Sequence, residues 1–372
     1  MNLTGKSTAR LVLYLAFCAA ILLVPSVLDD AFLLNKYSRY LVFAILAVSL
    51  SLSWGYAGIL NLGQAATFGL GSYAMAMGLK LRTVPVHTGS EGLPDFMVWN
   101  NVTELPWFWA PFHSMTFAIL AGLLIPAAFA ALLGWFMFRG RITGVYASII
   151  TLAVLVVVNL LIIDQQRYTG GFNGITDLAQ FEVAGFFFDA YSATTYYLVA
   201  LCLCVVLLLS LAVTRSKTGM ILQAIRDQEN RVRFFGYDVA LYQIFVFSLS
   251  AGIAGLAGML YTIVMEFASP TFLSVPLSLS VVIWVAVGGR QSLLGAAIGA
   301  LIVTGVQGAL SETEVFLESW MLIMGGLFVL AVLFLPKGIA GAVSMAVDRL
   351  PFFAGSARKS ASNVMKTTEA AS

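Results

Sequence analysis

Long apolar stretches separated by short polar segments make up most of this chain. A helix that crosses a lipid bilayer needs about 20 predominantly apolar residues, and segments of roughly this length recur from residue 11 to residue 335. The pattern predicts ten membrane-spanning helices, at 11–28, 40–58, 62–81, 115–138, 145–163, 192–213, 241–265, 276–288, 292–309 and 319–335. The eighth has only 13 residues, so a re-entrant helix or a half-helix competes with a full crossing there.

The distribution of basic residues favours ten full crossings with both termini in the cytoplasm. With the N-terminus inside, 15 Lys and Arg residues fall on the inner side of the membrane and 5 on the outer side, an excess that the positive-inside rule requires. Removing the eighth crossing would place Lys337 and the basic tail outside. We therefore expect a transmembrane domain at 1–337, with an outer loop at 82–114 and a cytoplasmic loop at 214–240. A disordered cytoplasmic tail at 338–372 follows.

Composition agrees with an all-α, polytopic integral membrane protein and argues against several other classes. Hydrophobic residues make up 60% of the chain and charged residues 10%, whereas a soluble domain carries about 25% charged residues. The net charge of +2 gives no reason to expect a nucleic-acid partner. Two histidines are too few for a histidine-based metal centre. The spans hold no paired carboxylates and no Ser/His/Asp set, so we expect no catalytic residue, cofactor or metal.

Uncharged polar residues at membrane depth are the candidates for a solute pathway. An amide buried in the membrane must find hydrogen-bond partners, so such residues usually face other helices. Hydrogen bonding between helices is therefore one interpretation of each candidate, and contact with a neutral, hydrogen-bonding solute is the other. Because amide side chains complement the N–H groups and carbonyl of urea without fixed charge, the second interpretation favours a small neutral amide. The candidates are Asn61, Gln64, Thr67, Asn159, Gln243 and Gln307.

Glycines recur at spacings that are typical of helix packing. Gly252, Gly255 and Gly258 lie three residues apart, and Gly295 and Gly299 form a small-xxx-small pair. Small residues let helix backbones approach closely inside a membrane. Tight packing within one subunit and an interface between subunits both remain open.

The cytoplasmic loop at 214–240 predicts a helix that docks another protein. Apolar positions recur between Met220 and Phe235 with charges between them, which predicts an amphipathic helix that ends at Gly236 as a C-cap. A basic helix lying on the anionic inner leaflet is one interpretation. The alternating signs of its charges favour a protein groove instead.

Four motifs are together specific to one family. They are GYAGILNLGQ with FGLGSY at 55–73, TGGFNGI at 169–175, AIRD with a following glycine at 224–236, and VGGR with GAAIGA at 287–300. Over roughly 41–338 the chain resembles the LivM-like permeases of bacterial ATP-binding-cassette importers for branched-chain amino acids and urea. The segments 93–112 and 230–238 resemble the urea branch more than the amino-acid branch. Position 64 departs from the family, because it is Gln where many relatives carry His.

The resemblance implies a non-catalytic permease subunit in the inner membrane that pairs with a second, homologous permease. It would receive solute from a periplasmic binding protein and dock two cytoplasmic ATPases, which would use the ATP. We expect the side chains of Ile221, Ile225 and Val232 to insert into an ATPase cleft. The coupling residues would be Ile221, Ala224, Ile225, Arg226, Glu229, Arg233 and Gly236. Urea is the favoured solute and a branched-chain amino acid the alternative.

Two other classes of protein stay open. An ion-coupled secondary transporter could have ten spans, and inverted repeats would support it. The chain shows no convincing repeat, and charges inside its spans are missing. A membrane enzyme that acts on lipids would need acid–base or metal groups near an interface, and no such cluster stands out.

Overall fold

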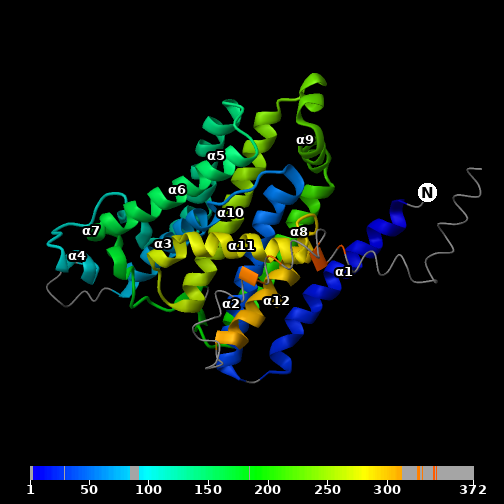
Figure 1. Ribbon diagram of the computed structural model, residues 1–372. Coiled ribbons are helices and arrows are strands. Elements are labelled where there is room, and N and C mark those ends of the chain that lie inside the picture. The colour runs from blue at the N-terminus through cyan, green and yellow to red at the C-terminus, as the bar shows by residue number, and fades with distance from the viewer. Residues whose placement is uncertain are drawn as a thin grey trace, which may run out of the picture.

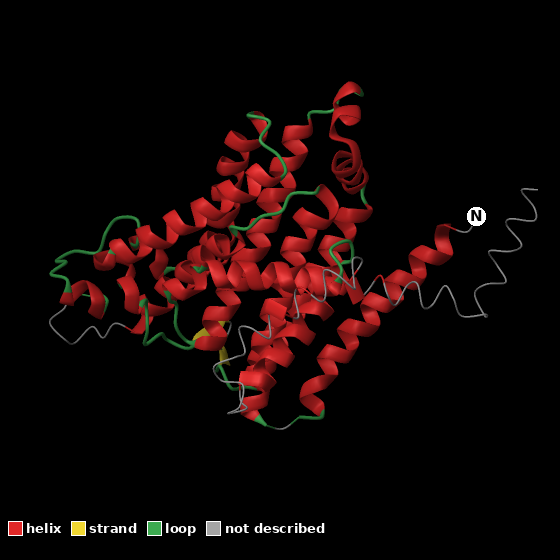
Figure 2. Cartoon of the chain, viewed as in Figure 1, coloured by secondary structure: helices red, strands yellow, loops and turns green. Residues whose placement is uncertain are grey.

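The computed structural model describes residues 3–28, 30–83, 92–183 and 185–311 and a few single positions between 325 and 341, with side chains from residue 11 onward. Helices make up nearly all of its regular structure, as the apolar pattern predicts (Figure 2). The exception is an antiparallel hairpin of β1 (Phe181–Val183) and β2 (Phe186–Phe188). The expectation of an all-α chain is wrong at this hairpin, where aromatic residues favour strands and Gly185 takes a positive φ of 82° in the turn.

Twelve α-helices lie within the described ranges. They are α1 (Leu3–Leu23), α2 (Ala31–Ser51), α3 (Gln64–Thr83), α4 (Asp95–Trp99), α5 (Met115–Arg139), α6 (Val145–Asp164), α7 (Gln166–Thr169), α8 (Ala193–Arg215), α9 (Lys217–Phe234), α10 (Val239–Met265), α11 (Val275–Gly288) and α12 (Leu293–Ser311). Shorter elements continue or connect them: the 3-10 helices η1 (Val24–Ser26), η3 (Ala110–His113), η4 (Gly171–Asn173) and η5 (Pro270–Leu273), and the π-helical η2 (Leu52–Tyr56).

Helix α10 lies at the centre of the bundle, packed against α3, α5 and α2 (Figure 1). Glycines make this packing close. A Cβ atom at Gly255 would meet the carbonyl of Gly122 on α5, and one at Gly258 would clash with the carbonyl of Phe68 on α3. Gly299 makes a similar close approach between α12 and α11. These glycines therefore serve helix packing within this chain, which is one of the two interpretations that their spacing leaves open.

Helix α1 stands apart from the bundle. Its C-terminal part leans on α8, where the Tyr196 hydroxyl donates a hydrogen bond to the Ile21 carbonyl at 3.0 Å. Its N-terminal half projects away from the other helices (Figure 1). Side chains on its outward face, such as Val12 and Leu13, are largely exposed, as suits a helix surrounded by lipid.

Six helices among the described residues are long and apolar enough to span a membrane. They are 31–56, 115–139, 145–164, 193–215, 239–265 and 293–311, and they correspond to the predicted second, fourth, fifth, sixth, seventh and ninth spans. The predicted count of ten is not confirmed. The apolar part of α1 and helix α11 are shorter, and α3 ends in a turn that carries Lys80 and Arg82. The tenth segment, 319–335, and the tail, 338–372, lie almost wholly outside the described residues.

Helix α11 is short because the chain before it already lies inside the bundle. Its 14 residues make about 21 Å of helix, less than the roughly 30 Å of a hydrocarbon core. The preceding η5 is tied to α6 by Asn159, whose amide donates to the Pro270 carbonyl at 2.7 Å. After α11, the Arg290 carbonyl accepts from the Ser51 hydroxyl at 3.0 Å, at the other end of the bundle beside α9. η5 and α11 together therefore connect the two ends of the bundle, although α11 alone is too short to do so.

This geometry predicts that Glu266, before α11, and Arg290, after it, lie on opposite sides of a membrane. Both residues are exposed. In a cysteine-free background, Glu266→Cys and Arg290→Cys should react with an impermeant thiol reagent from opposite sides. Arg231→Cys on α9 should label from the same side as Arg290→Cys. Labelling of positions 266 and 290 from one side would make α11 re-entrant.

Candidate functional site

Three of the predicted pathway residues, Asn61, Gln64 and Thr67, lie close together in the interior of the bundle, each at most 3% exposed. The Asn61 amide donates to Gln64 Oε1 at 2.7 Å. The Gln64 amide in turn donates to the hydroxyls of Ser49 on α2 (2.6 Å) and Ser250 on α10 (3.2 Å). We call Ser49, Asn61, Gln64 and Ser250 the amide cluster. The amide groups of the cluster are hydrogen-bonded to other side chains of this chain, so the structure agrees with the interpretation of these residues as hydrogen-bonding partners between helices.

The amide cluster lies beside a stretch of non-helical backbone, residues 58–63, that enters the bundle between η2 and α3. Backbone polar groups in an apolar interior need partners within the protein. Helix α6 supplies two of them: the Leu62 amide donates to the Thr151 hydroxyl at 3.1 Å, and the Leu60 carbonyl accepts from the Ser148 hydroxyl at 2.9 Å. The Asn61 side-chain oxygen accepts from the Gly63 amide at 2.9 Å. Side chains therefore supply the hydrogen bonds to the backbone of this segment that an α-helix supplies from its own backbone.

Helix α3 begins inside the bundle, at Gln64. The amide of Ala65 donates to the Ser278 hydroxyl of α11 at 3.0 Å, and the Thr67 hydroxyl donates back to the Gln64 carbonyl at 2.9 Å. Asn61 precedes the first helical residue and reaches the Gln64 side chain through a turn.

The other predicted pathway residues do not join the amide cluster. Asn159 is bonded to the carbonyls of Pro270 and Leu273, at 2.7 and 3.2 Å. Gln243 on α10 is 3% exposed, and its Oε1 atom has no hydrogen-bond partner in the described part of the chain. Gln307 lies half-buried near the end of α12. A pathway role for any of the six stays a prediction.

Helix α9, predicted to dock a partner, lies at one end of the bundle above α8 and α10 (Figure 1). Its course is broken at Gln228, whose φ of −153° and ψ of 81° are not helical. Gly236 follows the helix with a φ of 86°, so its predicted left-handed conformation is confirmed. Arg226 reaches across to the end of η2, where its guanidinium donates to the Gly55 carbonyl at 2.6 Å.

The apolar face of α9 is turned toward the chain's own helices. Ile225 and Val232 are 3% and 7% exposed and pack with Val239 at the start of α10, with Ile221 alongside. The expectation that these side chains insert into an ATPase cleft is therefore corrected, because amphipathicity marks an apolar face but not what covers it. The large apolar side chains that α9 and its end do expose are Met220, Phe234 and Phe235.

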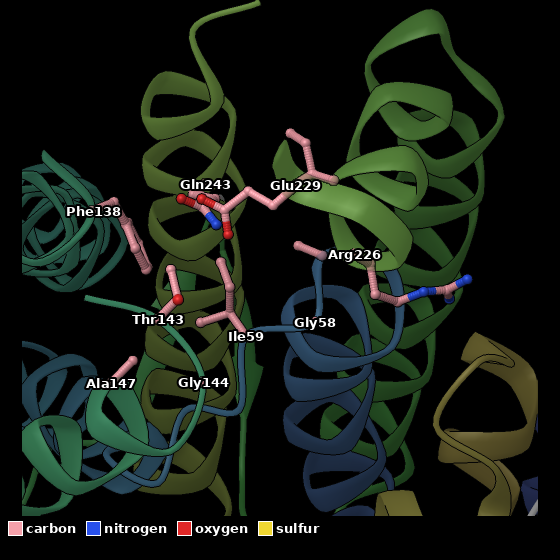
Figure 3. A pocket seen from close by; sticks show the side chains of 11 residues that line it. Gly58, Ile59, Phe138, Thr143, Gly144, Ala147, Arg226, Glu229 and Gln243 are labelled. Carbon is pink, nitrogen blue, oxygen red and sulfur yellow. The ribbon is translucent and has the colours of Figure 1, made fainter. Parts of the chain in front are cut away.

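A cavity of about 200 Å³ lies beneath α9 (Figure 3). Four parts of the chain close it: the segment after η2, the end of α5, the start of α6 and the side of α10. Its lining includes Gly58, Phe138, Thr143, Arg226, Glu229 and Gln243. One residue predicted for the solute pathway, Gln243, and three predicted for coupling, Ile225, Arg226 and Glu229, therefore line a single cavity.

Two charged residues of the bundle were not predicted as functional candidates from the sequence. Lys80 is 3% exposed and forms ion pairs with Asp95 (3.1 Å), at the start of α4, and with Asp177 (3.3 Å), in the loop before β1. The predicted second span begins at residue 40 and leaves Arg39 outside it, but α2 begins at Ala31 and contains Arg39. Its Nε atom is buried with no hydrogen-bond partner among the described residues. Because the predicted start of the second span is nine residues too late, Arg39 does not stand out in the sequence as a charge within a span. No group of three or more potential metal ligands occurs in the described ranges.

Comparison with known proteins gives a family match over most of the chain. The profile of a family described as "Branched-chain amino acid transport system / permease component" matches residues 32–332. The high-affinity branched-chain amino acid transport system permease protein LivM of Salmonella typhimurium is 27% identical over 321 residues, which are 80% of this chain and 68% of that protein. LivM of Escherichia coli gives the same figures.

A more distant relative points the same way. The probable branched-chain amino acid transport permease protein LivM of Methanocaldococcus jannaschii is 25% identical over 272 residues, 70% of this chain and 76% of that protein. No solved structure matches the chain significantly.

The amide cluster predicts a stability effect for Gln64. Replacing Gln64 by Met keeps most of its volume but removes the partner of Asn61 and the bonds to Ser49 and Ser250. Leaving buried polar groups unpaired costs about 1–3 kcal/mol, so the variant should unfold at a lower temperature in detergent. Gln307→Met, outside the cluster, should change stability by less than about 0.5 kcal/mol. Equal unfolding midpoints would mean that the amides are free for a solute.

Proposed function

The chain belongs to the family of permease components of branched-chain amino acid transport systems, and on this basis we propose that it is the membrane permease subunit of an ATP-binding-cassette importer for branched-chain amino acids. The observation that carries the proposal is the family match across residues 32–332, which takes in almost all of α2 and every later helix up to α12. The six candidate spans agree with a protein of the inner membrane.

Four partners follow from this proposal: a second, homologous permease, two cytoplasmic ATPases and a periplasmic binding protein. The permease contributes no covalent chemistry, because ATP would be hydrolysed by the ATPases. Helices α5 and α6 are the ones we expect to contact lipid or the second permease. Only 33% of the most apolar stretch of α5 and 22% of that of α6 is buried within this chain. We place both termini in the cytoplasm, on the strength of the 15-to-5 distribution of basic residues.

Urea is the second candidate solute. The outer segment 93–112 favours it through its resemblance to the urea branch of the family. The buried amides of Asn61 and Gln64 give urea little support, because they bond to each other and to serines. The three relatives reported above are all named for branched-chain amino acids. We therefore put branched-chain amino acids first.

Uptake by the complete transporter decides between the two solutes. The chain would be reconstituted into liposomes with its second permease and ATPases, supplied with ATP inside and binding protein outside. We expect ATP-dependent accumulation of labelled leucine and none of labelled urea. Accumulation of urea alone would reverse the order of the candidates, and accumulation of neither would contradict the proposed substrate class.

The exposed end of α9 predicts the site of ATPase docking. Phe234 is 90% exposed at the C-terminal end of α9, where an apolar ring gains by entering a cleft of a partner. Phe234→Asp should therefore reduce co-purification of the ATPases and transport together, while the permease remains inserted and monodisperse. Phe172→Asp is the matched control, because Phe172 is 77% exposed at the opposite end of the bundle. Equal co-purification by both variants would remove α9 from the docking surface.

A further inference from the structure

The cavity beneath α9 contains a buried hydrogen-bond acceptor that none of the described residues satisfies. Gln243 is 97% buried, and its Oε1 atom has no partner among the described residues. Its amide and the carboxylate of Glu229 extend toward one another on one side of the cavity, whereas the Arg226 guanidinium points away (Figure 3). A buried, unpaired acceptor costs free energy. A bound group that donates hydrogen bonds would remove that cost.

The acceptors around this position suit a cation that carries several N–H groups. Besides Gln243 Oε1, the lining offers the Thr143 hydroxyl and the Glu229 carboxylate, of which Oε1 already accepts from Arg233. Arg226 does not compete, because its guanidinium is bonded to the Gly55 carbonyl and to Asp227. An ammonium group has three donors and no acceptor, so it matches this set of oxygens.

A groove with the opposite charge adjoins the cavity. Thr143 and Glu229 line both spaces, and the groove adds the guanidinium groups of Arg141, Arg231 and Arg233. Arg233 is paired with Glu229, whereas Arg141 and Arg231 have no acidic partner in the described part of the chain. Arg141 also takes a φ of 58°, a conformation that costs a non-glycine residue free energy. Guanidinium groups bind carboxylates through paired hydrogen bonds.

We propose that the cavity and the groove together bind a small zwitterionic amino acid, with its ammonium group between Gln243 and Glu229 and its carboxylate on Arg141 and Arg231. The cavity, of about 200 Å³, is smaller than the roughly 300–1,000 Å³ of pockets for drug-sized ligands, so the part of the ligand that it encloses is small; the adjoining groove, of about 930 Å³, leaves room for the carboxylate. That the ligand is a branched-chain amino acid rests on the proposed function; the zwitterion site itself rests on the geometry.

Occupancy of this site bears on the movement of α9. The lining joins Glu229 on α9 to fixed parts of the bundle on α10 and at the start of α6, and Glu229 directly follows the break at Gln228. A ligand that bridges these elements holds α9 in the position seen here. The site faces the side to which solute is delivered, so imported amino acid binds there and slows further uptake.

Binding to the isolated permease tests the site. Equilibrium dialysis of labelled leucine with the purified chain should give saturable binding, weakened at least tenfold in Gln243→Met, which removes the acceptor, and in Thr143→Phe, which fills the cavity. The matched controls Gln180→Met, at an exposed position before β1, and Val145→Phe should bind like the wild type. Competition by 3-methylbutylamine and by 4-methylpentanoate, each with half of the zwitterion, should be at least tenfold weaker. Equal leucine binding by all five proteins, or binding by none, overturns the proposal.

Uptake by the complete transporter tests the consequence. The rate with unlabelled leucine inside the liposomes is divided by the rate without it, separately for each variant. This ratio should fall at least about fivefold below one, in the range of ordinary allosteric coupling, for the wild type and Val145→Phe, and stay near one for Thr143→Phe. A ratio near one for the wild type, or the same inhibition in Thr143→Phe, overturns feedback. Absence of leucine uptake in all variants counts against the proposed function, and dialysis then still decides the site.

Discussion

The architecture depends on one requirement, that backbone polar groups in an apolar surrounding find their partners inside the protein. Helices meet it by themselves. Residues 58–63 do not, and they are accommodated because α6 contributes Ser148 and Thr151 and because Asn61 turns its side chain onto the Gly63 amide. Gln64 then links this segment to α2 and α10. The polar residues in the interior are there first to make a break in the helical structure possible.

Close helix packing brings those partners into range. Ser49, Gln64 and Ser250 come from three different helices and meet only because α3 and α10 approach each other at backbone distance. Gly258 and Gly71 permit this approach, since a Cβ atom at either would strike the backbone of the facing helix. The hydrogen bonds of the buried polar side chains therefore depend on the close helix packing that the glycines allow, and the bonds in turn hold the packed helices together.

The positions of the helices could be predicted from the sequence where one hydrophobic periodicity dominates. Helix starts and the orientation of helix faces could not, because tertiary contacts determine them. Apolar length located the six candidate spans, and the glycine after α9 identified its left-handed residue. The start of α2 was placed nine residues late, because Lys36 and Arg39 read as loop charges although packing keeps them helical. The orientation of α9 could not be predicted, since Ile225 and Val232 would look the same facing α10 or a partner. The pairing of Lys80 with Asp95 and Asp177 joins residues up to 97 positions apart, and no local pattern contains that information.

The separate position of α1 has a consequence for how the chain is built. The family match begins at residue 32, and within the described residues α1 leans chiefly on α8. The bundle from α2 to α12 owes little of its packing to this helix. An apolar helix that precedes the bundle bears instead on membrane insertion, because the basic residues beside such a helix bias the direction in which it and the helices after it cross the membrane. Loss of α1 would leave the shape of the bundle largely intact and put its orientation at risk.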